Sequence, residues 1–202
     1  MPTVYILRHA EKEKGDFYNP HLRHQDQPLS ERGWEQSRQL WPYLCDKQIT
    51  AIYVSAYRRT GQTIEHVAAQ LGITPITDAR LNELDSGDLD PLSDEEIQER
   101  YPEFWKAYTE RTADFRFPGG ETGEEACRRI SGFLEEKRQA HPGENILFVT
   151  HEGLIRQLMC YIVGIPVYKR GNFYVDLCGI TEITYQPEFN NWKLIRFNQK
   201  LP

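Results

Sequence analysis

The sequence of 202 residues has few cysteines, and they lie far apart. Cys45, Cys127, Cys160 and Cys178 form no C-x-x-C pair, which predicts reduced thiols and argues against a disulfide framework or a zinc site. The chain also lacks a P-loop, an H-E-x-x-H helix and an acidic magnesium-binding loop. We therefore expect neither a metal nor a cofactor.

Excess basic charge and long apolar runs are also missing. The chain has 24 basic and 30 acidic residues and a net charge of -6, which does not favour nucleic-acid binding. Its apolar runs are interrupted well short of the roughly 18 residues that a membrane span needs. The first residues form an apolar strand pattern instead of a signal peptide. These features predict a cytoplasmic protein without nucleic-acid or membrane partners.

Apolar strand patterns alternate with amphipathic helix patterns along the chain, and no linker or repeat divides it. We therefore expect one domain over residues 1–202 with an α/β fold, a three-layer α/β/α sandwich around a mostly parallel sheet. The first strand begins at Thr3 and ends at Arg8 and His9. Later strands are expected at residues 51–55, 73–77, 145–150, 173–185 and 192–198.

Helix boundaries are also readable. Ser30 is an expected N-cap, and hydroxyl–carboxylate pairs at Ser93–Glu96 and Thr122–Glu125 are typical of capping boxes. Gly72 is expected to end the helix that follows the second strand.

Charged and imidazole side chains stand after several of these strands. The carboxyl ends of parallel strands meet at one edge of a sheet, so these groups should converge there. A helix expected to begin near Glu152 adds its N-terminal N–H groups. Arginines and histidines gathered in this way suit a compact dianion, above all a phosphoryl group. The converging groups are Arg8, His9, Arg58, Glu83 and His151.

This set of groups can do more than bind. His9 can act as a nucleophile towards phosphorus, because neighbouring cations favour the neutral imidazole. Glu83 is the candidate proton donor to the leaving oxygen, with Asp85 and Asp88 as alternatives. The same carboxylates could instead be solvated loop groups, and each motif alone is weak.

At this point the chain resembles the histidine phosphatase superfamily, the phosphoglycerate mutase-like group, over nearly its whole length. Six segments carry the resemblance: Leu7–Glu11 (R-H-G-E), Pro28–Gly33 (P-L-[ST]-x-x-G), Ser55–Thr63 (S-x-x-x-R-[AC]-x-x-T, with the alignment centred on Arg58), Leu81–Gly87 (L-x-E-x-x-x-G), Gly119–Thr122 (G-G-E-[ST]) and Val149–Arg156 (V-[ST]-H-x-G-x-I-R). The resemblance implies that His9 becomes phosphorylated, that Arg8, Arg58 and His151 hold the phosphoryl group, and that Glu83 donates the proton. It also implies a phosphoglycerate mutase-like fold and catalysis without a metal.

Some positions depart from the family pattern. Ala10 replaces a glycine, Lys12 stands where a serine or threonine is usual, and Arg59 replaces a small residue. Lys12, Arg59 and Glu152 are further candidates for substrate binding, although Arg59 could also point to solvent. Cofactor-dependent mutases of the family are longer, so the resemblance favours its phosphatase branch.

The resulting prediction is a metal-independent phosphomonoester hydrolase for a small phosphorylated metabolite. A mutase-type phosphotransferase and a phospho-ligand-binding module with little turnover are the alternatives, and a homodimer is left open. The aromatic stretch at 101–117 is either a satellite core or a lid. Lys169 and Arg170 either bind a second anionic group or are solvated.

Overall fold

A six-stranded sheet forms the centre of the protein, here a computed structural model that describes residues 3–201. The first four strands in its order are parallel, and the last two complete it as an antiparallel pair. The sheet confirms the predicted α/β class. Its strands, in spatial order, are β5 (Ile76–Thr77), β4 (Ile49–Val54), β6 (Asn145–Thr150), β1 (Thr3–Arg8), β7 (Ile180–Gln186) and β8 (Asn191–Gln199).

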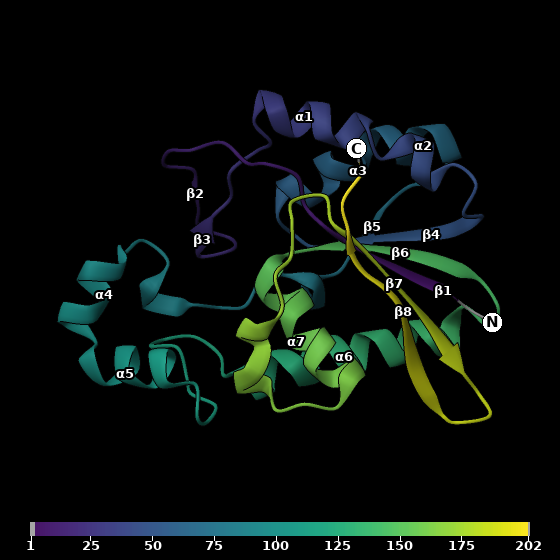
Figure 1. Ribbon diagram of the computed structural model, residues 1–202. Coiled ribbons are helices and arrows are strands. Elements are labelled where there is room, and N and C mark those ends of the chain that lie inside the picture. Colours follow the sequence, from purple (N-terminus) through teal and green to yellow (C-terminus); the bar gives the residue numbers. More distant parts are fainter. Residues whose placement is uncertain (1–2, 202) are drawn as a thin grey trace.

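Helices cover both faces of this sheet, as Figure 1 shows. One face carries α1 (Glu31–Arg38), α2 (Trp41–Leu44) and α3 (Arg58–Leu71). The other carries α6 (Gly123–Ala140) and α7 (Glu152–Val163). Two separate hydrophobic clusters fill the spaces between these layers.

Strand β1 shows why its sequence forms a covered central strand. Val4 and Ile6 belong to the cluster under α6 and α7, whereas Tyr5 and Leu7 belong to the cluster under α1 to α3. Successive side chains of a strand point to opposite faces, so a strand between two layers must be apolar throughout. This burial fixes the direction in which the end of β1 points.

The predicted helix boundaries are confirmed. The Ser30 hydroxyl accepts a hydrogen bond from the backbone N–H of Gly33 at the start of α1. Both capping boxes are formed, at Ser93 and at Thr122. Gly72 ends α3 with a left-handed φ of 68°, a conformation that costs glycine little.

Two predicted strands are shorter than expected. The strand predicted at 73–77 pairs only at Ile76 and Thr77, because Pro75 has no N–H to donate and β5 is an edge strand. The strand predicted at 173–185 begins at Ile180. Cys178 has a φ of 56°, so the backbone cannot run as a regular strand through that position.

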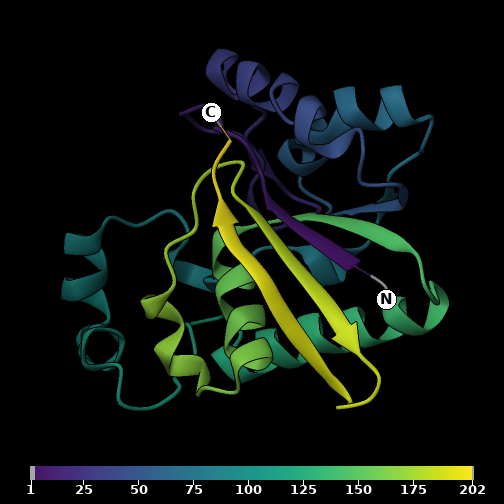
Figure 2. The ribbon, with the colours of Figure 1, turned by 45° about the vertical axis from the view of Figure 1, so that its right-hand side comes forward.

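Two short helices, α4 (Asp94–Arg100) and α5 (Pro102–Glu110), stand beside the α/β layers (Figure 2). Phe104 of α5 lies 5.3 Å from Phe115 and 5.2 Å from Phe117, measured between ring centroids. The aromatic stretch therefore forms a small core of its own. A β-hairpin of β2 (Tyr18–Asn19) and β3 (His24–Gln25) lies between β1 and α1 in the chain. Within residues 3–201, no helix is long and apolar enough to cross a membrane.

Candidate active site

A cavity of about 170 Å³, which we call the inner cavity, lies at the carboxyl ends of the parallel strands. Arg8 is the last residue of β1 and His9 follows it, while Glu83 comes after the short helix η1 (Ala79–Leu81). These three side chains line the cavity. His151, directly after β6, packs against His9 with ring centroids 5.1 Å apart. The structure thus brings together these four of the five groups that the sequence selected.

His9 is held with one nitrogen available for reaction. Its side chain is 5% exposed, and Nδ1 donates a hydrogen bond to the Ala10 carbonyl oxygen at 2.7 Å. A carbonyl can only accept, so the neutral ring keeps its lone pair on Nε2. Burial, followed by the positive charge of Arg59, holds the pKa of His9 well below its usual value. The free imidazole is therefore neutral at neutral pH.

The second arginine that lines the inner cavity is Arg59, and Arg58, which the sequence analysis selected, does not line it. Arg59 is 5% exposed, lines the cavity and donates from Nη2 to Nδ1 of His151 at 3.2 Å. The Arg58 side chain is 53% exposed and pairs through Nε with Asp26 at 3.2 Å. The two arginines begin α3, where neighbouring residues point about 100° apart, so only one of them can face the cavity.

His151 has a defined tautomer. It is fully buried, and its Nδ1 accepts from Arg59, so Nε2 carries the proton and donates to the Ser55 hydroxyl at 2.8 Å. The Tyr57 ring packs on it with centroids 5.0 Å apart. Burial and the charge of Arg59 hold the pKa of His151 well below its usual value. His151 is thus a neutral, oriented neighbour of His9.

Glu83 occupies the N-terminus of α7. Its carboxylate accepts from the backbone N–H groups of Leu84, Gly153 and Leu154 at 2.8, 3.3 and 3.1 Å. These bonds favour the ionised form, but burial outweighs them and raises the pKa of Glu83. A methyl group on Gly153 would stand 2.7 Å from Glu83 Oε1, so glycine is needed there. We expected these helix N–H groups to face a phosphoryl group, and two of them instead position the carboxylate.

Arg8 is oriented by protein partners. Its Nη1 donates to the Val175 carbonyl at 2.5 Å, and its Nη2 pairs with Glu152 Oε2 at 2.8 Å. Glu152 also pairs with Arg156. Glu152, a predicted substrate-binding residue, thus contacts Arg8 and does not itself line the inner cavity. Within residues 3–201, the buried Nε atoms of Arg8 and Arg59 have no hydrogen-bond partner.

Lys12 also lines the inner cavity, as predicted for a substrate-binding candidate. Its Nζ donates to Gln27 Oε1 at 3.3 Å. Burial, followed by the nearby charge of Arg59, lowers the pKa of Lys12. Arg8, Lys12 and Arg59 thus outnumber the two carboxyl groups that line the cavity, those of Glu83 and Asp90.

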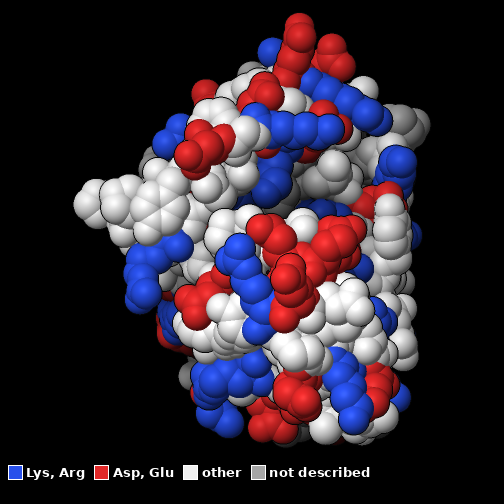
Figure 3. Space-filling view, turned by 90° about the vertical axis from the view of Figure 1, so that its left-hand side faces the viewer, with Lys and Arg blue, Asp and Glu red and all other residues white. Residues whose placement is uncertain are grey.

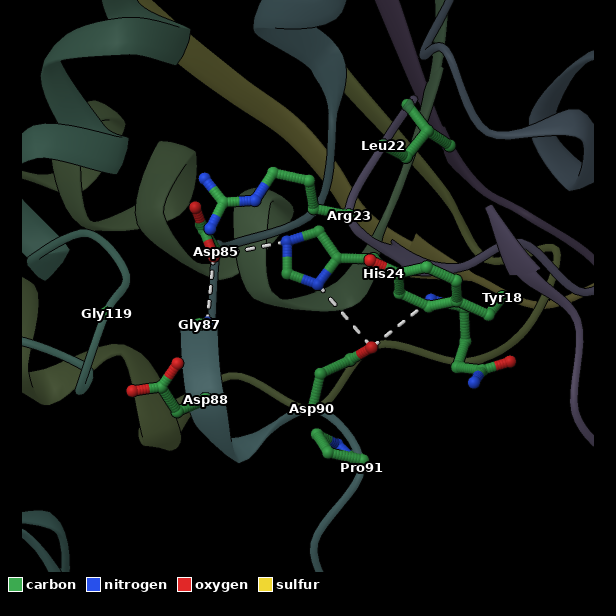
Figure 4. Close-up of a pocket in the computed structure, with 11 residues that line it drawn as sticks. Tyr18, Leu22, Arg23, His24, Asp85, Gly87, Asp88, Asp90, Pro91 and Gly119 are labelled. Atoms are coloured by element: carbon green, nitrogen blue, oxygen red, sulfur yellow. Dashed lines mark hydrogen bonds and ion pairs between the residues drawn. The ribbon is translucent and has the colours of Figure 1, made fainter. Parts of the chain in front are cut away.

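A larger outer cavity of about 390 Å³ adjoins the inner one, and His24, Gln25 and Asp90 line both. Figure 4 shows the His24 ring between two carboxylates, with Nε2 3.2 Å from Asp85 and Nδ1 3.5 Å from Asp90. Asp88 lines the outer cavity only. Figure 3 shows acidic and basic side chains interspersed around a hollow on this side of the molecule. The outer cavity is polar and carries both signs of charge.

Some cavity residues were not singled out from the sequence. Ser55, which bonds His151, stands within the recognised Ser55–Thr63 motif but received no role. Tyr57 lies under the guanidinium of Arg59, with the ring centroid 4.2 Å from Cζ. His24 and Gln25 lie in a polar loop whose hairpin brings them to the site, and no spacing signal marks them.

No group of three His, Cys, Asp or Glu side chains within residues 3–201 is arranged to hold a metal ion. Catalysis without a metal stays a prediction.

Comparison with known proteins gives a consistent family. The model of the histidine phosphatase superfamily (branch 1) matches residues 4–200. "Phosphoserine phosphatase 1" of Hydrogenobacter thermophilus is 32% identical over 193 residues, covering 94% of this chain and 90% of that protein. "Probable phosphoglycerate mutase GpmB" of Cronobacter sakazakii is 34% identical over 195 residues, covering 92% and 86%. The structure of a mycobacterial glucosyl-3-phosphoglycerate phosphatase superposes with a TM-score of 0.83 at 22% identity, covering 98% and 99%, and so shares the fold.

Proposed function

Because this chain belongs to the histidine phosphatase superfamily, we propose that it hydrolyses a small phosphomonoester through a covalent phosphohistidine at His9. The observation that carries the proposal is the geometry of His9. Its Nε2 is unprotonated, while Arg8 and Arg59 beside it each have a buried N–H without a partner in residues 3–201. A phosphoryl group in the inner cavity would compensate the charge of both guanidinium groups.

The first step transfers the phosphoryl group to the protein. His9 Nε2 attacks phosphorus, a P–N bond forms, and the bond from phosphorus to the ester oxygen breaks. Glu83, whose pKa burial raises, gives a proton to the leaving oxygen. The products of this step are an alcohol, a phosphohistidine and a Glu83 carboxylate.

The second step returns the protein to its starting state. A water molecule attacks the phosphohistidine while the Glu83 carboxylate takes one of its protons. The P–N bond breaks, and inorganic phosphate leaves. Arg8 and Arg59 stabilise the charge on the phosphoryl oxygens in both steps, and His151 orients Arg59 by accepting its hydrogen bond.

The two cavities support a small substrate. The inner cavity, at about 170 Å³, suits the phosphoryl group, and the outer cavity, at about 390 Å³, suits the alcohol part of a metabolite. Because Asp85, Asp90 and Arg23 line the outer cavity, we expect a polar alcohol. Phosphoserine, phosphoglycerates and sugar phosphates are the first substrates to test.

The proposal is tested by hydrolysis of p-nitrophenyl phosphate with and without a chelator. We expect activity in both conditions for the parent and for His21→Ala, an exposed-histidine control, and none for His9→Ala. Brief exposure to radiolabelled substrate should leave an acid-labile, alkali-stable label on the parent and on His21→Ala, but not on His9→Ala. Full activity of His9→Ala would refute the phosphohistidine. Isomerisation of a phosphoglycerate without net phosphate release would instead indicate a mutase.

A further inference from the structure

A third cavity, separate from the inner and outer cavities, lies where α5 meets α7 and the short helix η3 (Val167–Asn172). Its volume is about 40 Å³, and a water molecule needs roughly 10–15 Å³, so it can hold a group of a few atoms. We call it the arginine cavity after its three basic residues. Its charged and aromatic lining consists of Arg111, Arg156, Arg170, Tyr108, Phe115 and Tyr168.

The charge of Arg170 is poorly compensated. The residue is 9% exposed, and its Nη1 has no hydrogen-bond partner within residues 3–201. The Asp114 carboxylate lies 4.0 Å from Nη1 but accepts from the backbone N–H groups of Gly123 and Glu124 at 3.1 and 2.9 Å. Nη1 lies beside Gly123 and Asp114, and the Phe115 ring centroid is 4.7 Å from Cζ. The guanidinium thus has an aromatic ring and one distant carboxylate as its charge partners, and burying a cation without a close anion is costly.

The backbone also brings Arg111 to the cavity. Arg111 ends α5 in a left-handed conformation with φ of 50°, which is uncommon for arginine. Its guanidinium packs directly on Gly171, where a methyl group would stand 2.1 Å from Nη1. Of the residues in 3–201 that line the cavity, none is acidic. The positive lining therefore depends on a glycine that leaves room for the guanidinium.

We propose that the arginine cavity binds a small oxyanion, either inorganic phosphate or the carboxylate or phosphoryl group of a metabolite. Guanidinium groups bond such oxygens in a bidentate way. The rest of a larger bound ligand would extend out of the cavity past Tyr108 and Arg111, which are exposed. The cavity is linked to the inner one by ion pairs, because Arg156 pairs with Glu152 and Glu152 pairs with Arg8. The proposal does not depend on the reaction proposed above.

The test must separate this cavity from the inner one, which should also bind phosphate. We therefore use Arg59→Met as the background and measure the melting temperature against inorganic phosphate, with sodium chloride at equal ionic strength as reference. Phosphate at ten times its dissociation constant should raise the melting temperature by about 3–6 °C. Adding Arg111→Met should abolish the rise. Arg100→Met removes the same charge from α4, away from the cavity, and should preserve the phosphate-induced rise in melting temperature.

Gly171→Ala gives an independent test, because it keeps all three arginines and displaces only the end of Arg111. In the Arg59→Met background it should weaken phosphate binding about tenfold or more by calorimetry. Acetate in place of phosphate tests for a carboxylate ligand. Absence of any phosphate or acetate effect in the Arg59→Met background would overturn the proposal, as would an effect that Arg111→Met and Gly171→Ala leave unchanged.

Discussion

Replacing Arg59 by methionine should nearly abolish phosphatase activity, whereas the same change at Arg58 should leave most of it. Arg59 is 5% exposed and lines the inner cavity, while the Arg58 side chain is 53% exposed and pairs with Asp26. The two substitutions remove the same charge from adjacent positions. The pair therefore tests which arginine faces the substrate.

The expected magnitudes follow from these contacts. A hydrogen bond to a charged group contributes about 1.5–3 kcal/mol, and a guanidinium fork makes two of them with a phosphoryl group. Loss of about 3–6 kcal/mol of transition-state stabilisation lowers kcat/KM roughly 10²- to 10⁴-fold. Arg58 does not line the inner cavity, and buried Asp26 keeps its hydrogen bonds from the Arg58 backbone N–H and from Asn19, so Arg58→Met should change kcat/KM less than about fivefold.

The assay is steady-state hydrolysis of p-nitrophenyl phosphate, with the melting temperature of each variant as the control for folding. A pH profile adds a second measurement, because Arg59 is one of the charges that lower the pKa of His9. Without Arg59 the pKa of His9 rises, and activity should be lost at a higher pH on the acidic side. Equal losses for the two variants, or an unmoved acidic limb in Arg59→Met, would refute the reasoning.

Three further predictions concern the groups around the inner cavity. Glu83→Gln should lower kcat about 10²- to 10⁴-fold for an alkyl phosphate but much less for p-nitrophenyl phosphate, whose leaving group needs no proton; equal losses would exclude the acid role. Gly153→Ala should displace the Glu83 carboxylate, since its Cβ would stand 2.7 Å from Oε1, and should therefore show the same leaving-group dependence in milder form; unchanged kinetics would contradict this geometry. Asp90 and Asp85 raise the pKa of His24 above its unfolded value of about 6.5, so its stabilising contribution is complete below pH 6.5 and is lost as pH rises through the folded pKa. Denaturant titrations from pH 6 to 9 should accordingly show a steeper loss of stability in the parent than in His24→Gln, and parallel curves would argue against the contribution.

Strand ends were the most predictable part of the site. The apolar runs before Arg8 and His151 can only form covered strands, and parallel strands bring their carboxyl ends together. His9 and His151 were therefore placed correctly without knowledge of the loops. Glu83 was selected from its place in a loop after a strand, the L-x-E-x-x-x-G motif agreed, and the structure adds the amide contacts that hold it.

The difference between the predicted Arg58 and the Arg59 that lines the cavity has a simple geometric origin. Two arginines stand side by side, and the register of α3 alone decides which one faces the cavity. Counted from Ser55, the S-x-x-x-R motif places its arginine at Arg59. The alignment was centred on Arg58, one residue earlier, although the spacing itself indicates Arg59. The contacts of His24 were less accessible, because they join a hairpin to a loop about 60 residues later in the chain.

The helices α4 and α5 are much less buried than strand β1, and this difference has a consequence for the evolution of the protein. Within the described chain, α4 and α5 contain no buried residue, whereas four of the six residues of β1 are buried. Exposed positions tolerate most substitutions with changes of about 0.5 kcal/mol or less, while core positions do not. The segment beside the cavities can therefore diverge quickly at little risk to folding, and the strands that hold the reactive groups must change slowly. Slow change in the strands and fast change beside the cavities would produce relatives that share one sheet but are named for different phosphorylated compounds.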